Sequence, residues 1–106
     1  MTLSNTRPPR AVNAARGEAV AVLAGEARRL CLTLGALAEI ETGLGVEGVE
    51  ALAARMRGLG ARDLMTVLAA LLRGGGEAEL ADRLSDVAIS PKEAALAVAA
   101  AFEAAA

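Results

Sequence analysis

A change in the spacing of apolar residues constrains the fold of this chain more than any other feature. Between Glu18 and Leu32, apolar side chains alternate with small or polar ones, whereas beyond Thr33 they recur every three or four positions. Alternation is typical of a half-buried strand, and the wider spacing is typical of an amphipathic helix. The sequence therefore predicts strands first and helices afterwards, in an α+β fold that is mostly α.

Two short alternating runs flank the segment Ala24-Gly25-Glu26. Val20 and Val22 share one face of the first run, and Leu30 and Leu32 share one face of the second. A glycine-bearing loop between two such runs predicts a β-hairpin. A lone hairpin is only marginally stable in water, so we expect its apolar face, with both valines, to pack on helices.

Capping residues, glycine and proline divide the rest of the chain into short helices. Thr33 is a predicted N-cap, and Ser90-Pro91-Lys92-Glu93 predicts a capping box with proline at the first helical position. The triplet Gly74-Gly75-Gly76 ends the most apolar helix, and we interpret it as a flexible linker. The predicted helices follow Thr33, span about Glu47–Arg57, Ala61–Arg73 and Glu77–Val87, and follow Ser90. The predicted fold is an N-terminal β-hairpin packed on a bundle of four to five short helices.

Alanine accounts for much of the hydrophobic content, which is 55% of the 106 residues. It favours helices strongly but buries little area, so each alanine adds little hydrophobic stabilisation. The core volume must come from leucine, valine, isoleucine, methionine and the single phenylalanine, Phe102. We therefore expect a thin core, with more apolar helix surface than one small domain can hide.

Charge is divided unevenly along the chain. Residues 1–16 contain three arginines and no acid, whereas residues 17–106 contain eight basic and thirteen acidic side chains. This division predicts a disordered basic arm over residues 1–16, ahead of a single domain over residues 17–106. The arm is either a contact for an acidic surface or nucleic acid, or an unpacked terminus.

The cellular compartment follows from what the chain contains. A single cysteine, Cys31, allows no internal disulfide and favours a reducing compartment. The longest apolar runs, Met65–Leu72 and Ala94–Phe102, are far shorter than the roughly 20 residues of a membrane-spanning helix. Pro8-Pro9 and Arg10 interrupt the place where a secretory signal would have its apolar segment. We expect a cytoplasmic protein without membrane contact.

Residues that commonly perform catalysis are scarce. The chain has no histidine, so the commonest general base and metal ligand is missing. The acid pairs Glu39/Glu41 and Glu77/Glu79 stand two positions apart, which turns the two side chains of each pair in different directions on a helix. We therefore expect no catalytic residue, no metal ligand and no cofactor, and the chain is not predicted to be an enzyme.

A basic cluster offers a weak nucleic-acid hypothesis. Arg55, Arg57 and Arg62 surround Gly58–Gly60 and would be able to meet phosphates. The predicted domain is acidic, however, and aromatic stacking platforms are absent from the sequence. A small DNA-binding regulator is therefore the least favoured hypothesis.

Several blocks of sequence, taken in order after the predicted hairpin, resemble a known family. The blocks are Leu32-Thr33-Leu34-Gly35-Ala36-Leu37-Ala38-Glu39-Ile40-Glu41, Leu44-Gly45-Val46, Ala61-Arg62-Asp63-Leu64 and Leu72-Arg73-Gly74-Gly75-Gly76. Together they resemble a small gene transfer agent family of alphaproteobacteria, which is related to phage tail proteins. Its members are described as tail tube proteins or as tail assembly chaperones. The resemblance extends over about Gly17–Gly76 and covers the last helix only loosely.

The resemblance implies a role in tail morphogenesis. Tail assembly chaperones coat the long, helical, apolar tape measure protein until tube subunits replace them. The resemblance thus implies a chaperone that binds the tape measure protein in the bacterial host cell. A structural, tube-associated tail component is the alternative, although one hairpin provides few strands for a closed ring. The sequence leaves the oligomeric state open, a homo-oligomer included.

A chaperone of this kind needs apolar helix faces that a partner can reach. The candidate partner-binding residues are Leu96, Val98, Ala99 and Phe102 on the last helix, and Leu68 and Leu72 on the third. The stripe that contains Leu68 and Leu72 is also wide enough for a central packing helix, so core packing is the competing interpretation for these two leucines.

Overall fold

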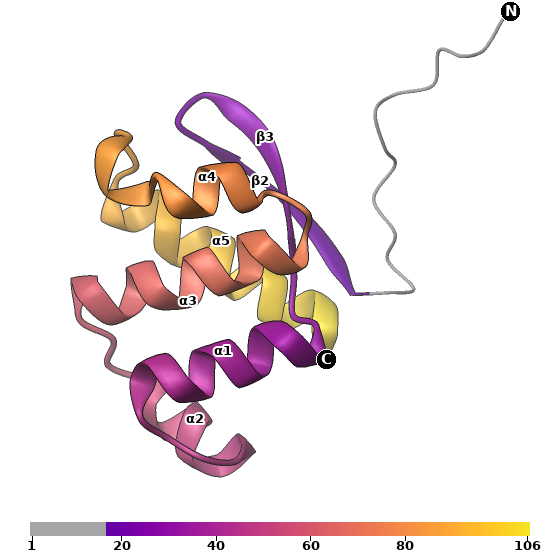
Figure 1. Cartoon of the computed structure of the whole chain (residues 1–106), viewed down its shortest axis with the longest axis vertical. Helices are drawn as coiled ribbons and strands as arrows, with labels where there is room; N and C mark the ends of the chain where they lie inside the picture. The colour runs from indigo at the N-terminus through magenta and orange to yellow at the C-terminus, as the bar shows by residue number, and fades with distance from the viewer. Residues whose placement is uncertain (1–16) are drawn as a thin grey trace, which may run out of the picture.

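The structure of the chain, a computed structural model, describes residues 17–106. The elements are β2 (Glu18–Leu23), β3 (Glu26–Cys31), α1 (Leu34–Leu44), α2 (Val49–Met56), α3 (Ala61–Gly74), α4 (Ala78–Asp82), the 3-10 helix η2 (Leu84–Asp86) and α5 (Pro91–Ala105). Figure 1 shows α1, α3 and α4 side by side, with α3 in the middle and α5 behind them. The predicted α+β fold is confirmed. The predicted basic arm lies outside the described residues, and the single domain over residues 17–106 stays a prediction.

The hairpin forms where the alternating runs predict it. Strands β2 and β3 pair antiparallel, with Ala19 opposite Leu30 and Leu23 opposite Glu26. Ala24 and Gly25 alone connect them, and both have positive φ angles, 52° and 84°. Positive φ at both turn positions matches the right-handed twist of the strands and makes a tight two-residue turn.

The face of β2 that packs on helices is not the predicted one, whereas the predicted Leu30 and Leu32 of the second run do lie against the core. Leu23 and Leu30 are fully buried, whereas Val20 and Val22 are 44% and 60% exposed. Helix α5 packs against β2 and buries alanines of its own. An alanine-rich helix can lie close to a strand only where that strand also presents small side chains, such as Ala21, which packs against the core. The small side chain of Ala21 thus allows α5 to pack closely on this face of β2.

Helix boundaries follow the predicted caps closely. The hydroxyl of Thr33 accepts a hydrogen bond from the N–H of Ala36 at 3.0 Å. At α5, Ser90 Oγ accepts from the N–H of Glu93 at 3.1 Å, and Glu93 Oε1 accepts from the N–H of Ser90 at 3.3 Å. Both cap predictions are confirmed. The predicted fourth helix is wrong in length, because α4 ends at Asp82 and a separate 3-10 turn follows.

The core is centred on α3. Its buried residues are Val67, Leu68, Ala70, Leu71 and Leu72. Helix α1 covers α3 with Ala36, Ile40 and Leu44. Leu34, the first residue of α1, is by contrast 83% exposed. It stands two positions before Ala36, which at about 100° per residue places it on the opposite side of the helix.

The glycine triplet is not a flexible linker. Gly74 is the last residue of α3, and a Cβ there would lie 2.1 Å from the carbonyl oxygen of Cys31. A Cβ on Gly75 would lie 2.2 Å from the carbonyl oxygen of Arg29. Real Cβ atoms cannot come this close to backbone oxygen, so only glycine allows the end of α3 to lie against β3. The triplet is a packing contact between two elements.

Candidate functional site

An apolar groove lies between α3 and α5 and consists of two hollows that share Leu64. The first hollow, of about 200 Å³, lies between the N-terminal parts of the two helices. It is lined by Ala61, Leu64, Met65, Leu68, Leu84, Ile89, Ser90, Pro91 and Ala94. The second hollow, of about 280 Å³, is lined by Met56, Leu59, Leu64, Ala95, Val98 and Ala99. We call the two hollows together the α3–α5 groove.

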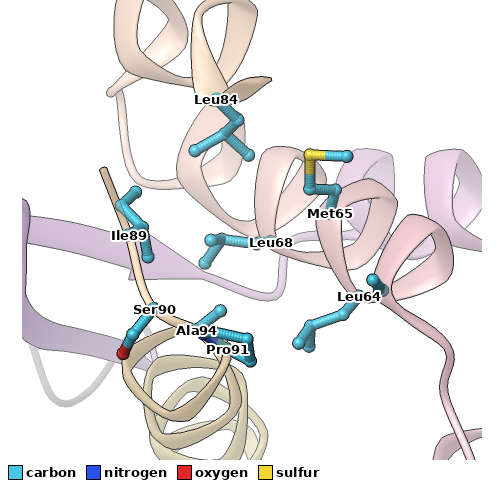
Figure 2. Close-up of a pocket in the computed structure, with 9 residues that line it drawn as sticks. Leu64, Met65, Leu68, Leu84, Ile89, Ser90, Pro91 and Ala94 are labelled. Carbon is cyan, nitrogen blue, oxygen red and sulfur yellow. The ribbon is translucent and has the colours of Figure 1, made fainter. Parts of the chain in front are cut away.

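Figure 2 shows how the first hollow is built. Leu64 projects from α3 toward Pro91 at the start of α5, whereas Met65 points toward the side of the hollow where Leu84 of η2 lies. The capping box at Ser90 fixes where α5 begins and therefore which of its side chains face α3.

The groove results from the alanine content of α5. On the side toward α3 and the end of α2, this helix presents Ala94, Ala95 and Ala99. Larger residues at these positions would fill the space opposite Leu64. The same composition that makes the core thin therefore leaves a gap between two helices, and the gap is apolar.

Methionine lines each half of the groove. Met56, at the end of α2, lines the second hollow, and Met65, which is 41% exposed, lines the first. Methionine is unbranched, with three rotatable bonds and a polarizable sulfur, so it adapts to differently shaped partners. This lining suits a surface that must accept more than one apolar side chain.

The size and lining of the groove determine what it can bind. Each hollow is smaller than the roughly 300–1,000 Å³ typical of small-molecule pockets. Among the described residues that line the two hollows, none is ionisable. Such a groove offers apolar burial to single side chains, as in recognition of an amphipathic helix through residues at i, i+3, i+4 and i+7.

The structure divides the six predicted partner-binding residues. Leu68 forms part of the first hollow, and Val98 and Ala99 line the second. Leu72 is fully buried and lines neither hollow, so core packing is the correct interpretation for it. Leu96, at 62% exposure, is accessible but lies outside both hollows.

Phe102 is half-buried against the core. The α3–α5 groove therefore includes only some of the six residues, and partner binding by Leu96 and Phe102 stays a prediction. Sequence reasoning missed Met56, Leu59 and Met65. The sequence signal that could have identified the groove is the position of Met56 and Met65, each at the edge of an apolar helical stripe.

Arg55 is a structural residue rather than part of a free basic cluster. Its guanidinium donates to the carbonyl oxygen of Leu44 at 2.7 Å and pairs with the carboxylate of Asp63. These contacts join the end of α1, α2 and the start of α3, which positions Met56 beside the groove. Of the predicted cluster of three arginines, only Arg57 and Arg62 make no ion pair within residues 17–106.

Residues 17–106 contain neither a cluster of metal-ligating side chains nor a membrane-spanning helix. No group of three or more cysteine, aspartate or glutamate side chains in this range is arranged to hold a metal ion. None of the helices there has both the length and the apolarity needed to cross a membrane.

A family model described as phage tail tube protein, GTA-gp10, matches residues 16–106 of the chain. The chain belongs to this family. The predicted resemblance to a gene transfer agent tail family is confirmed, and the GTA-gp10 match includes the last helix, where the resemblance was loose. Searches among curated proteins and among solved structures found no match.

Membership in the GTA-gp10 family makes this chain a tail-related protein of a gene transfer agent. Proteins of a tail act in contact with other tail proteins, so a partner-binding surface is the feature to look for. The α3–α5 groove lies within the matched residues.

Proposed function

We propose that the chain is a tail assembly chaperone that binds an apolar helical segment of the tape measure protein in the α3–α5 groove. It acts by binding alone, without catalysis. The observation that supports this most is the groove itself, an open apolar gap between α3 and α5 with methionine in each half.

The physical properties of the groove suit a temporary contact. The two hollows, of about 200 and 280 Å³, have room for single side chains of a partner helix and present no charged group to hold it. Affinity per site is then modest, and subunits of the growing tube are able to displace the chaperone. The adaptable lining around Met56 and Met65 also favours binding to several similar segments rather than to one.

A structural tail component is the second candidate, and it is favoured by the outer edge of β2, on which no other strand pairs within residues 17–106. Arg29, which pairs with Val20, turns its backbone N–H away from β2. Paired residues of an antiparallel ladder share this orientation, so Val20 turns its N–H and C=O outward as well. An apolar strand with a free edge is a template for strand addition. A two-stranded sheet nevertheless contributes few strands to a closed tube.

Co-expression with the neighbouring tape measure protein, followed by a pull-down, tests the chaperone proposal. Wild-type chain should retain the tape measure protein, and Met65→Asp should lose it, because the new carboxylate would have to be buried without a partner. Leu34→Asp is the matched control, since Leu34 is 83% exposed on α1 and outside the groove.

Mass spectrometry of purified particles separates the two candidates. A chaperone should be absent or present only in trace amounts. Stoichiometric abundance in the particles would overturn the chaperone proposal in favour of the structural one. Retention of the tape measure protein by Met65→Asp would show that the groove is the wrong surface.

A further inference from the structure

The basic side chains of the described residues fall into two groups. Those of the first group are bound to acids: Arg28 pairs with Glu26 and Glu77, Arg55 pairs with Asp63, and Arg73 pairs with Glu39 and Asp82. Arg29 belongs with them, because its charge acts on the carboxylate of Glu77. Their charges are therefore used within the fold.

The second group consists of Arg57, Arg62, Arg83 and Lys92. All four are exposed, and within residues 17–106 none has an ion pair. Each stands next in the chain to a residue that lines the groove: respectively Met56, Ala61, Leu84 and Pro91. We call these four residues the rim cations.

The acids near the groove offset only part of this positive charge. Asp63, next to Leu64, pairs with Arg55. Glu93, next to Ala94, accepts from the N–H of Ser90 but keeps its negative charge, and Asp86 on η2 is exposed. These two carboxylates offset two of the four rim cations. The rim of the groove thus keeps an excess of positive charge, although residues 17–106 as a whole contain more acidic than basic side chains.

We propose that the occupant of the α3–α5 groove is an amphipathic helix of a partner protein whose apolar stripe is flanked by aspartate and glutamate. The inference rests on the proposed function for the site and adds the chemistry of the segment that the site selects. Apolar side chains would enter the two hollows while the flanking carboxylates face the rim cations. Charge complementarity also excludes the basic N-terminal segment of this chain, which contains Arg7, Arg10 and Arg16, as the occupant.

The charges are expected to select and orient the partner more than to hold it. Exposed ion pairs are individually weak, and salt screens them beyond about 10 Å at 0.1 M ionic strength. Complementary charge around an apolar patch instead accelerates association and rejects partners of the wrong sign. The net positive charge of residues next to the groove would therefore discriminate between acidic and basic helices of equal hydrophobicity.

Two synthetic helical peptides provide the direct test. Both carry the same leucine and alanine stripe, flanked by glutamate in one peptide and by lysine in the other. Fluorescence anisotropy with the full chain at low salt should show the glutamate peptide binding at least tenfold more tightly. Raising the salt to about 0.5 M should remove most of that preference, because the screening length becomes shorter than the separations involved.

A charge-swapped variant keeps the test independent of folding. The double variant Arg62→Glu, Lys92→Glu should reverse the preference and bind the lysine peptide more tightly, which a merely destabilised protein would not do. Both positions are exposed and lie in first turns of helices, where added negative charge favours the helix dipole.

Several outcomes would overturn the inference. These are equal affinity for the two peptides, preference of the wild type for lysine, no binding of the glutamate peptide, or a preference that salt leaves unchanged. A salt-sensitive dimer in sedimentation that Met65→Asp abolishes would make a second copy the occupant instead. If the chain retains the tape measure protein but shows no charge preference, the proposed function stands and the inference about acidic helices fails. If the chain binds the acidic peptide but does not retain the tape measure protein, the inference stands and the proposed function fails.

Discussion

The carboxylate of Glu77 accepts a hydrogen bond from the backbone N–H of Arg29 at 3.1 Å. It also pairs with the guanidinium of Arg28 at 3.0 Å. The backbone N–H of Arg29 points to the edge of β3 that does not face β2. The Glu77 side chain, at the start of α4, therefore accepts from a donor that another strand would otherwise use. Gly75 lies against the carbonyl oxygen of the same residue. The protein closes this edge of the sheet with a helix terminus.

Close contact at this edge predicts a severe effect of adding one methyl group. Gly75→Ala would place a Cβ 2.2 Å from the carbonyl oxygen of Arg29, and neither backbone is free to move away. Overpacking of this kind costs about 1–3 kcal/mol. Urea unfolding should therefore show a lower midpoint for Gly75→Ala. Gly58→Ala is the control, because a Cβ at Gly58 meets nothing within 4 Å. Equal midpoints for the two variants would contradict the close packing of the triplet.

The Glu77 carboxylate predicts a dependence of stability on pH. Burial by itself raises the pKa of Glu77, but the hydrogen bonds from Arg29 and Arg28 outweigh it and hold the pKa below its ordinary value. A lowered pKa in the folded state means that the stabilisation is complete above the ordinary value and is lost as pH falls through the lowered one. Glu77→Gln should therefore be less stable than wild type at neutral pH.

The difference between wild type and Glu77→Gln should shrink as pH falls below about 4.3, the ordinary glutamate pKa. Chemical unfolding at a series of pH values measures it. Glu79→Gln serves as the control, because the Glu79 side chain is exposed and forms neither a hydrogen bond nor an ion pair with any other residue in the range 17–106. If the difference in free energy of unfolding between wild type and Glu77→Gln stayed constant as the pH fell below about 4.3, the charge of Glu77 would contribute nothing to stability.

Local signals in the sequence were sufficient for the order and the boundaries of most elements. Thr33 and Ser90 act through residues three positions away, so their role as caps does not depend on the rest of the fold. The hairpin was equally accessible, because its alternation and its turn are contiguous. These features express backbone requirements that short segments satisfy by themselves.

Features that depend on a distant element were not predictable in the same way. Alternation of Val20 with Ala21 indicates a strand but does not indicate which face is buried. The buried face is determined by the alanine-rich helix α5, which packs against β2. The triplet at Gly74 suggested flexibility because its contact, Cys31, lies far away in the sequence. The groove was missed for the same reason, since it is a gap between helices and no single segment encodes a gap.

The capping box at the start of α5 is expected to stabilise the whole domain. Ser90→Ala removes the acceptor for the N–H of Glu93 and should cost about 1 kcal/mol, the usual effect of losing an N-cap. The melting temperature would fall by several degrees. Ser85→Ala, an exposed serine outside any helix cap, should leave it unchanged. Similar melting temperatures for both variants would mean that packing alone sets where α5 begins.

Filling the groove from its own wall is the most selective way to test its use. Ala99 is exposed and lines the second hollow, so Ala99→Leu places a larger apolar side chain where a partner side chain would lie. The variant should keep or slightly increase its stability, because leucine suits a helix and covers apolar surface. It should nevertheless retain the tape measure protein at least several-fold less well in a pull-down. Ala38→Leu, on an exposed position of α1, is the matched control for the added hydrophobic surface. If both variants retain the partner equally, the second hollow takes no part in binding.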